Sequence, residues 1–309
     1  MKKIARLMFT IGLLMILTGV ILIRQDSITT LFNTHFSSNN TKVNITDTNK
    51  YYRDYDFLFV QNISDKTPSN YQDLLNVYYT VINSGKDEYT FYCPRNEYKD
   101  CITDVESIAN DQTLLSNINN YVHPYNSFSH IETEFDNLGK VTITIERHYS
   151  KDDIEKINKK VDEIYNEIYN DNISPYDNIK AFHDYIINNT KYDSDRSDKN
   201  IIKYRSDIAY GPLFEGYAIC GGYTDLMELF LEKMELKSFR VSSHMHIWNV
   251  VKIKDKWYHI DLTWDDPVLS DGTDSILHDY MLIDTNKLLE LEKTQHNFNQ
   301  NIFLEVKEK

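Results

Sequence analysis

Two apolar segments in the last third of the chain constrain its fold more than any other feature. Residues 247–253 and 257–263 are rich in β-branched and aromatic side chains, and three polar residues, 254–256, separate them. This composition predicts two strands joined as an antiparallel hairpin. The number of residues in the turn then decides which side chains share a face.

If Lys254 and Asp255 form a two-residue turn, Trp248 lies opposite Asp261. His246 and Asp261 are then diagonal neighbours on one face, roughly 7–8 Å apart at the backbone and within side-chain reach. A turn of three residues would place the histidine and the aspartate on opposite faces. The hairpin therefore predicts a His–Asp pair on the condition of a two-residue turn.

A cysteine stands ahead of this hairpin, at a predicted helix start. Cys220 follows Gly216 and precedes Gly221 and Gly222, after which apolar residues recur at helical spacing over 226–234. The free N–H groups of a helix N-terminus favour a thiolate and can hold an oxyanion. The glycines would let a substrate backbone approach closely. The alternative is a tight loop-to-helix join whose cysteine only packs.

A thiol, an imidazole and a carboxylate in this order are the parts of a nucleophilic centre. We predict Cys220 as nucleophile, His246 as base and Asp261 as its orienting partner, with Gly221, Trp248 and Tyr217 as oxyanion or pocket residues; His259 and His244 are rivals for the base. The aromatic ring of Trp248, on the same face as His246, could shield the ion pair from water.

Two other classes of function remain open from the same residues. The side chains of Cys220, His244, His246, His259 and Asp261 could be zinc ligands. No Cys-x-x-Cys is present, and the carboxylate is better placed behind a histidine than on a metal, so we predict no metal and no cofactor. A cell-surface binding module that lacks catalysis is the third possibility.

The N-terminus predicts a membrane-directed segment. Residues 7–23 are uncharged and apolar, Lys2, Lys3 and Arg6 precede them, and no small-residue cleavage site follows. We interpret residues 1–25 as a single-pass anchor or uncleaved signal rather than a cleaved signal peptide. The polar composition of residues 26–50 predicts a stalk. The rest of the chain would then be extracytoplasmic.

Net charge excludes one class of partner, and the cysteines indicate the compartment and a reactive thiol. The formal net charge of −14 over 309 residues, with no basic patch, excludes a nucleic-acid backbone partner. Cys93 and Cys101 lie close in sequence among turn-forming residues, so a short disulfide loop is plausible outside the cytoplasm. That pairing leaves Cys220 as the odd cysteine, which favours a reactive thiol. The oligomeric state is not predicted.

The remaining chain predicts two α+β regions, an accessory region over 51–149 and a catalytic domain over 150–309. The first is expected to contain a strand at 56–60, a helix from Ser69 to Gly85, a strand at 88–93, a helix at 105–118 and a hairpin of 131–135 with 141–145. The second begins with helices capped by Ser150 and Ser174, followed by a polar loop over 190–206. We interpret the adjacent pair His183-Asp184 as structural, because neighbouring residues on a helix do not face each other.

Taken together, these motifs resemble the bacterial transglutaminase-like superfamily, a branch of the papain-like cysteine enzymes. The resemblance covers about residues 174–284 and rests on Cys220-Gly221, His246-Ile247-Trp248-Asn249, the run from Trp257 to Pro267, the lead-in helix from Tyr176 to Tyr192 and the segment Tyr280 to Asp284. It implies an α+β fold in which a helix bearing the cysteine packs on an antiparallel sheet bearing the histidine and the aspartate. It also implies an enzyme that acts on amide bonds of proteins or cell-wall peptides through a thioester, as peptidase, deamidase or amine acyltransferase, or an inactive member of that fold.

Overall fold

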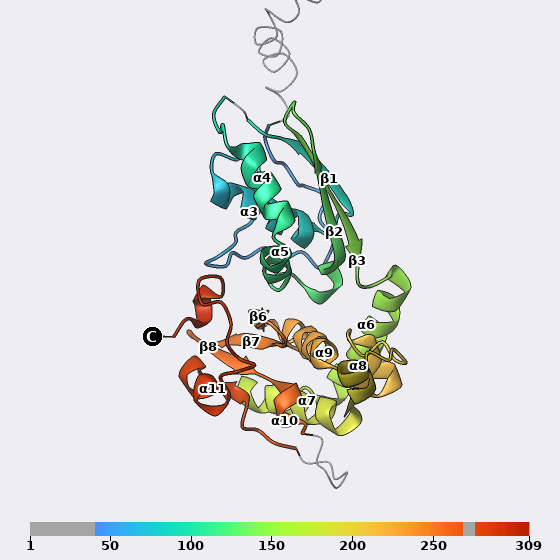
Figure 1. Ribbon diagram of the computed structural model, residues 1–309. Helices are drawn as coiled ribbons and strands as arrows, with labels where there is room; N and C mark the ends of the chain where they lie inside the picture. Colours follow the sequence, from blue (N-terminus) through green and yellow to red (C-terminus); the bar gives the residue numbers. More distant parts are fainter. Residues whose placement is uncertain (1–40, 95, 268–275, 309) are drawn as a thin grey trace, which may run out of the picture.

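The computed structural model describes residues 41–94, 96–267 and 276–308 and has the mixed α+β composition that the sequence predicts (Figure 1). The first half contains α3 (Tyr71–Ser84), β1 (Glu88–Tyr92), α4 (Cys101–Asn110), α5 (Gln112–Asn119), the 3-10 helix η2 (Pro124–Asn126), β2 (Phe128–Phe135) and β3 (Lys140–Arg147). The three strands form one antiparallel sheet in the order β1-β3-β2. The predicted hairpin of this region is confirmed as β2 and β3.

The second half carries the segments of the predicted catalytic domain. It contains α6 (Lys151–Ile168), α7 (Pro175–Asn189), β4 (Lys191–Tyr192), α8 (Ser194–Lys199), the π-helix η3 (Gly211–Glu215), β5 (Tyr217–Ala218), α9 (Cys220–Lys233), β6 (Ser238–Ser242), β7 (Ile247–Ile253), β8 (Lys256–Ile260), α10 (Leu262–Asp265), β9 (Met281–Ile283), α11 (Thr285–Leu291) and the 3-10 helix η4 (Leu304–Val306). A four-stranded antiparallel sheet runs in the order β6-β7-β8-β9. Helix α9 packs on β6 and β7, and α6 and α7 also contact it (Figure 1).

Three local signals act as the sequence predicts. The Ser150 hydroxyl accepts a hydrogen bond from the Asp153 backbone N–H, and the Asp153 carboxylate accepts one from the Ser150 N–H, which completes a capping box at the start of α6. Ser174 caps α7 ahead of a proline in the first turn. Helix α3 ends at Gly85, whose φ of 77° lies in the left-handed region that glycine tolerates best.

Three local predictions are wrong. Residues 56–60 form no strand: the Phe57 N–H donates to the Val60 carbonyl, so the segment turns back while it buries both apolar side chains. The single helix predicted over 105–118 is two helices, α4 and α5, because the Asp111 side chain accepts from the Leu114 N–H and caps a new helix. The predicted loop over 190–206 contains β4 and α8.

The predicted stalk ends earlier than the sequence suggests. Val43 is fully buried and pairs with Lys66 in an isolated β-bridge, and Ile45 is also buried. Residues from Val43 onward are therefore part of the folded region, because their few apolar side chains join its core. The predicted anchor (1–25) and the rest of the stalk, up to residue 40, lie outside the described residues. Within the described ranges, no helix has the length and apolar character needed to cross a membrane.

One hydrophobic cluster links the two predicted regions. Its fully buried members include Val77 of α3, Val141 of β3, Phe239 of β6 and Trp248 of β7. One face of the β6–β9 sheet therefore packs on the accessory region, while a second cluster fills the space around α6, α7 and α9. The boundary near residue 150 stays a prediction, but the accessory region is part of what holds the sheet in place.

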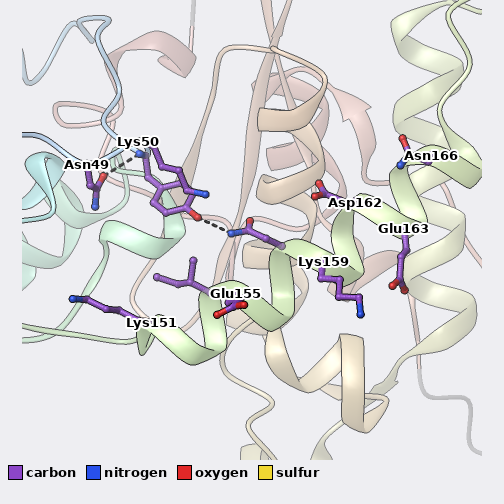
Figure 2. Close-up of a pocket in the computed structure, with 11 residues that line it drawn as sticks. Asn49, Lys50, Lys151, Glu155, Lys159, Asp162, Glu163 and Asn166 are labelled. Atoms are coloured by element: carbon purple, nitrogen blue, oxygen red, sulfur yellow. Dashed lines mark hydrogen bonds between the residues drawn. The ribbon is translucent and has the colours of Figure 1, made fainter.

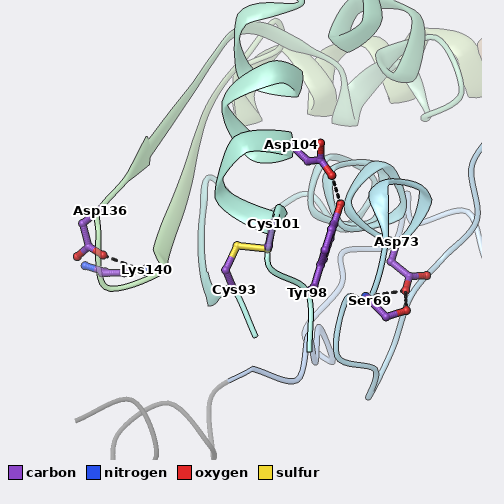
Figure 3. The surroundings of a disulfide bond; sticks show 8 residues. All are labelled: Ser69, Asp73, Cys93, Tyr98, Cys101, Asp104, Asp136 and Lys140. Atoms are coloured by element: carbon purple, nitrogen blue, oxygen red, sulfur yellow. Dashed lines mark hydrogen bonds between the residues drawn. A yellow bond between two sulfur atoms is a disulfide. The ribbon is translucent and has the colours of Figure 1, made fainter. Parts of the chain in front are cut away.

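A disulfide joins Cys93, after β1, to Cys101, the first residue of α4 (Figure 3). Both cysteines are buried, and the Tyr98 hydroxyl between them in sequence donates to Asp104 of α4. The plausible pairing of these two cysteines is confirmed. Among the described residues, Cys220 is the free cysteine, and it is partly exposed.

Replacing both disulfide cysteines by serine is expected to lower the free energy of unfolding by about 2–3 kcal/mol, the chain-entropy value for so short a loop. Urea denaturation of the double variant, compared with wild type under oxidising conditions, measures the difference. Dithiothreitol should lower wild-type stability similarly and leave the double variant unchanged. Equal stability of variant and wild type would contradict a stabilising role.

Candidate active site

The hairpin has the register on which the predicted His–Asp pair depends. Ile253 of β7 pairs with Lys256 of β8, which leaves Lys254 and Asp255 as a two-residue turn. Lys254 has a φ of 56°, as the first residue of a tight hairpin turn requires. The conditional prediction is confirmed: the register extends past the ends of the strands and brings His246 and Asp261 to one face.

The histidine and the aspartate meet in the protein interior. His246 Nε2 lies 2.5 Å from Asp261 Oδ2, and both side chains are almost fully buried. The other carboxylate oxygen, Oδ1, accepts the backbone N–H groups of Thr263 at 3.0 Å and Trp264 at 3.3 Å, so Asp261 also caps α10. The carboxylate is thus held from both sides, and it fixes the orientation of the imidazole.

Cys220 is the first residue of α9, as the sequence predicts. The first turns of the helix are fastened to β7: the Thr224 hydroxyl donates to the Ile247 carbonyl at 3.0 Å, and the Asn249 amide donates to the Thr224 carbonyl at 3.0 Å. These bonds align the start of α9 with the start of β7, where His246 stands. The predicted core, a cysteine-bearing helix packed on an antiparallel sheet that carries the histidine and the aspartate, is therefore confirmed.

The charge state of His246 follows from its neighbours. Burial lowers its pKa, but the charge and hydrogen bond of Asp261, together with a hydrogen bond and charge interaction with Cys220, raise the pKa to about 10. Burial would raise the pKa of Asp261, but the charge and hydrogen bond of His246 hold it well below its usual range. Because Nε2 is engaged by Asp261, Nδ1 is the nitrogen left for Cys220. At neutral pH the imidazole is a cation beside the sulfur.

The two positions after Cys220 require glycine for a different reason from the one that the sequence predicts. A Cβ at Gly221 would lie 2.6 Å from the Asp207 carbonyl oxygen, and a Cβ at Gly222 would lie 2.3 Å from the Ser206 carbonyl oxygen. The glycines are therefore there because the 206–207 backbone packs against the helix start, and the prediction that they make room for a substrate backbone is wrong for these positions. Whether the Gly221 N–H holds an oxyanion stays a prediction.

Gly222→Ala is accordingly expected to destabilise the protein by about 1–3 kcal/mol, the usual cost of overpacking. The helix start must also move away from the Ser206 carbonyl, so alkylation of Cys220 should slow. Thermal unfolding and the rate of iodoacetamide labelling measure the two effects. Gly216→Ala is the matched comparison, because its Cβ meets only the Asn189 carbonyl at 3.7 Å and its cost comes from a φ of 71° instead. An unchanged labelling rate in Gly222→Ala would show that the contact does not position the thiol.

The predicted aromatic residues lie in different surroundings. Trp248 is fully buried, and its ring stacks on His246 with centroids 5.6 Å apart, which agrees with a shielding role. Tyr217 is half-buried and stacks on Tyr204 with centroids 4.1 Å apart. In β5, Tyr217 pairs with Lys191 of β4. The contribution of either ring to a pocket stays a prediction.

Of the two rival bases, His259 is excluded by its contacts, and the role of His244 stays untested. His259 is fully buried, accepts the Trp248 indole N–H on Nδ1 and contacts the Thr285 hydroxyl through Nε2. Burial lowers its pKa to about 3, so it is neutral. His244 is exposed, and its ring nitrogens make no hydrogen bond to another residue within the described ranges. The zinc-ligand set considered from the sequence is thus divided, because His259 faces Trp248 and Thr285.

His296 is a site residue that the sequence analysis missed. Its Nε2 lies 2.9 Å from Asp261 Oδ2, so two imidazoles share one carboxylate oxygen. It is fully buried, stacks on Tyr280, and its Nδ1 lies 3.0 Å from the Glu292 carbonyl. No signal in the polar stretch around it pointed to this role. The contact exists only because the C-terminal segment folds back over the sheet.

Tyr192 also lies within electrostatic range of Cys220. Burial raises the pKa of the Tyr192 hydroxyl, and the charge of Cys220 contributes further. Its hydroxyl donates to Ser197 of α8 at 3.1 Å. Tyr192 sits on β4 opposite Ala218 of β5, two residues before Cys220. Strand β4, in a segment predicted to be a loop, thus places a phenol within electrostatic range of the thiol.

The expectation that the adjacent side chains of His183 and Asp184 do not face each other is wrong. Their side chains do meet: His183 Nδ1 lies 3.1 Å from Asp184 Oδ1. The imidazole is fully buried, and its Nε2 lies 3.1 Å from Asp265 Oδ2. Helical spacing alone therefore gave a wrong prediction. The side chains of these two neighbours rotate toward each other while each also contacts other residues. Neither side chain of the pair has a described contact with the Cys220 thiol. Asp265 and Asp261 lie at the two ends of α10.

An open groove lies between residues 49–51 and α6 (Figure 2). Its volume is about 720 Å³, and its wall mixes lysines and carboxylates of α6. The Asn158 amide donates to the Tyr51 hydroxyl at 2.6 Å across it. None of its lining residues belongs to the Cys220, His246 and Asp261 group, so the groove is separate from the candidate active site.

Comparison with known proteins gives distant likenesses only. No protein-family model and no curated protein match the chain. A solved structure of a transglutaminase is 16% identical over 44% of this chain and 44% of its own, with a TM-score of 0.31. A candidate cysteine protease from Cytophaga hutchinsonii is 16% identical over 48% of this chain and 65% of its own, with a TM-score of 0.28.

The chain thus spans less than half the length of the transglutaminase and less than two thirds of the protease. At such TM-scores these likenesses support no conclusion about the chemistry of this chain. The case for a thiol centre rests on the geometry of Cys220, His246 and Asp261.

Proposed function

We propose that this protein is an extracytoplasmic, membrane-anchored thiol acyl-enzyme that acts on amide bonds of proteins or cell-wall peptides. The observation that carries the proposal is the buried contact of 2.5 Å between His246 Nε2 and Asp261 Oδ2 beside Cys220 at the start of α9. Cys220 is the nucleophile, His246 the acid and base, and Asp261 its orienting partner.

In the first step the Cys220 thiolate attacks the amide carbonyl, and a bond forms between Sγ and the carbonyl carbon. The C–N bond breaks as His246 Nδ1 gives its proton to the leaving nitrogen, and a thioester and a free amine result. The N–H groups of Cys220 and Gly221, which have no acceptor within α9, can stabilise the oxyanion.

In the second step water or a primary amine attacks the thioester carbonyl, and His246 takes one proton from the attacking water or amine. The C–S bond breaks and the thiolate returns. With water the product is an acid, and with an amine it is a new amide. Asp261 keeps the imidazole in one orientation through both proton transfers.

The proposed location rests on two features. The charged and apolar N-terminal sequence is typical of a membrane anchor. The Cys93–Cys101 disulfide is of the kind that forms and persists in oxidising compartments. Both support an extracytoplasmic active site, and protease accessibility of the folded region in intact cells tests it.

The alternative is a binding module of the same fold without catalysis. A peptide library, incubated with the protein in the presence and absence of a labelled primary amine, separates the possibilities by mass spectrometry. Cleaved or deamidated peptides indicate hydrolysis, and labelled peptides indicate transfer. Neither product should form with Cys220→Ala, and full turnover by that variant would overturn the mechanism. Bound but unmodified peptides would support the binding module instead.

A further inference from the structure

A second group of histidines and carboxylates lies between α7 and the segment that leads into β9. His183, Asp184 and His278 each present one ligand atom, and the three atoms all lie within 4.8 Å of one another. Asp184 Oδ1 is 2.6 Å from His278 Nε2 and 3.1 Å from His183 Nδ1. The proposed amide chemistry does not use this group.

The outer contacts orient these side chains toward a common point. His183 is fully buried, and its Nε2 lies 3.1 Å from Asp265 Oδ2; the tautomer that binds a cation through Nδ1 carries its proton on Nε2 and donates it to Asp265. In that tautomer, the His183 Nδ1 lone pair points at the Asp184 carboxylate. A carboxylate behind a histidine is the usual outer-shell arrangement of protein zinc sites. Asp265 is itself held, because its Oδ1 accepts the Tyr280 N–H at 3.0 Å.

A neighbouring lysine orients the carboxylate of Asp184. Lys180 Nζ bonds Asp184 Oδ2 at 2.5 Å, which leaves Oδ1 directed at the two imidazoles. Asp184 Oδ1, the oxygen that Lys180 does not contact, thus faces two ring nitrogens.

We propose that His183 Nδ1, Asp184 Oδ1 and His278 Nε2 form a site for a divalent zinc-type cation. Two imidazoles and one carboxylate suit zinc, with a fourth position for water. A cation between the three atoms would be held by one lone pair from each imidazole and by one carboxylate oxygen. His278 is about one-third exposed, so the site opens to solvent on that side.

The cation would join elements that are distant in sequence. His183 and Asp184 belong to α7, and His278 stands three residues before β9, the edge strand beside β8. Asp265 ends α10, the helix that Asp261 caps. Bound metal is therefore expected to stabilise the packing of α7 against the segment that leads into β9, through ligands that do not include Cys220.

Zinc analysis of the full chain after loading with ZnCl₂ and dialysis tests the site. We expect one zinc per chain and a higher melting temperature with zinc. His278→Ala and Asp184→Asn, both at partly exposed positions, should bind zinc more than about 100-fold more weakly, a larger loss than that of an outer-shell partner. His130→Ala, which removes an exposed histidine of β2, is the matched control and should bind as wild type.

Cobalt replacement distinguishes the ligands. Co²⁺ at this site should give visible absorption without a thiolate charge-transfer band, and prior alkylation of Cys220 should leave both spectrum and zinc content unchanged. The proposal is overturned if wild type retains no zinc, or if His278→Ala retains it, as metal at His246, Asp261 and His296 would allow. Loss of zinc on Cys220 alkylation overturns it too. Metal-free melting temperatures of the variants show that each is folded.

Discussion

His246→Ala is expected to slow alkylation of Cys220 by iodoacetamide at pH 6 by roughly 100-fold. An unassisted cysteine thiol, with a pKa of about 8.5, is only about 0.3% ionised at that pH, and the thiolate is the reactive form. In wild type the imidazole of His246 makes a hydrogen bond and a charge interaction with Cys220. A cation beside a thiol generally promotes its ionisation. Alkylation needs no knowledge of the substrate, so it tests the pair directly.

The pH dependence has a definite sign. The difference between wild type and His246→Ala should be largest below pH 8 and should shrink as pH rises, because every thiol becomes ionised in alkaline solution. Above about pH 10 the imidazole loses its proton and with it the attraction for the thiolate. His244→Ala, which removes an exposed histidine two residues away, is the control and should label as wild type. Equal rates in His246→Ala and wild type at pH 6 would end the case for a catalytic pair.

Arg53→Met is expected to lower the free energy of unfolding by about 3–5 kcal/mol, because it leaves a buried carboxylate unpaired. Arg53 Nη2 lies 2.5 Å from Glu228 Oε1 and 2.5 Å from Glu232 Oε1, both on α9. The side chains of Arg53 and Glu228 are 2% and 0% exposed, so solvent cannot compensate the loss. Urea denaturation measures the change.

A second substitution separates charge from packing. Glu228→Gln added to Arg53→Met removes the unpaired charge, so the double variant should be more stable than Arg53→Met alone. Lys42→Met provides the surface control, because the pair of Lys42 with Asp65 is largely exposed and should contribute little. If Arg53→Met were no less stable than Lys42→Met, the buried ion pair would not be what fastens α9 to the accessory region.

The position of α9 explains why this ion pair bears on the site. Arg53 comes from the start of the accessory region and also donates to the Tyr121 and Ser238 carbonyls at 2.9 and 3.1 Å. Arg240 of β6 makes a similar link, bonding Asp225 of α9 at 2.8 Å and the Asn119 carbonyl at 2.7 Å. The accessory region therefore helps to fix the helix whose first residue is Cys220.

The sequence by itself determined what local chemistry can determine. Side-chain period limited the outcome to two registers of β7 and β8, and the two-residue turn in the structure selected the one that places His246 and Asp261 on one face. Capping residues set the starts of α6 and α7, and the small residues around Cys220 set the start of α9. Each of these signals acts over a few residues, which is why a single sequence carries it.

Only the tertiary structure decided which distant groups meet. His296 reaches Asp261 from 35 positions along the chain, and Asp265 meets His183 over 82, distances at which no local pattern carries information. The same holds for Gly222, whose missing side chain is explained by the Ser206 carbonyl and not by a substrate. Residues 56–60 failed as a strand because burial of Phe57 and Val60 in a shared core outweighed their local preference. Packing between segments set these contacts, and packing depends on the whole fold.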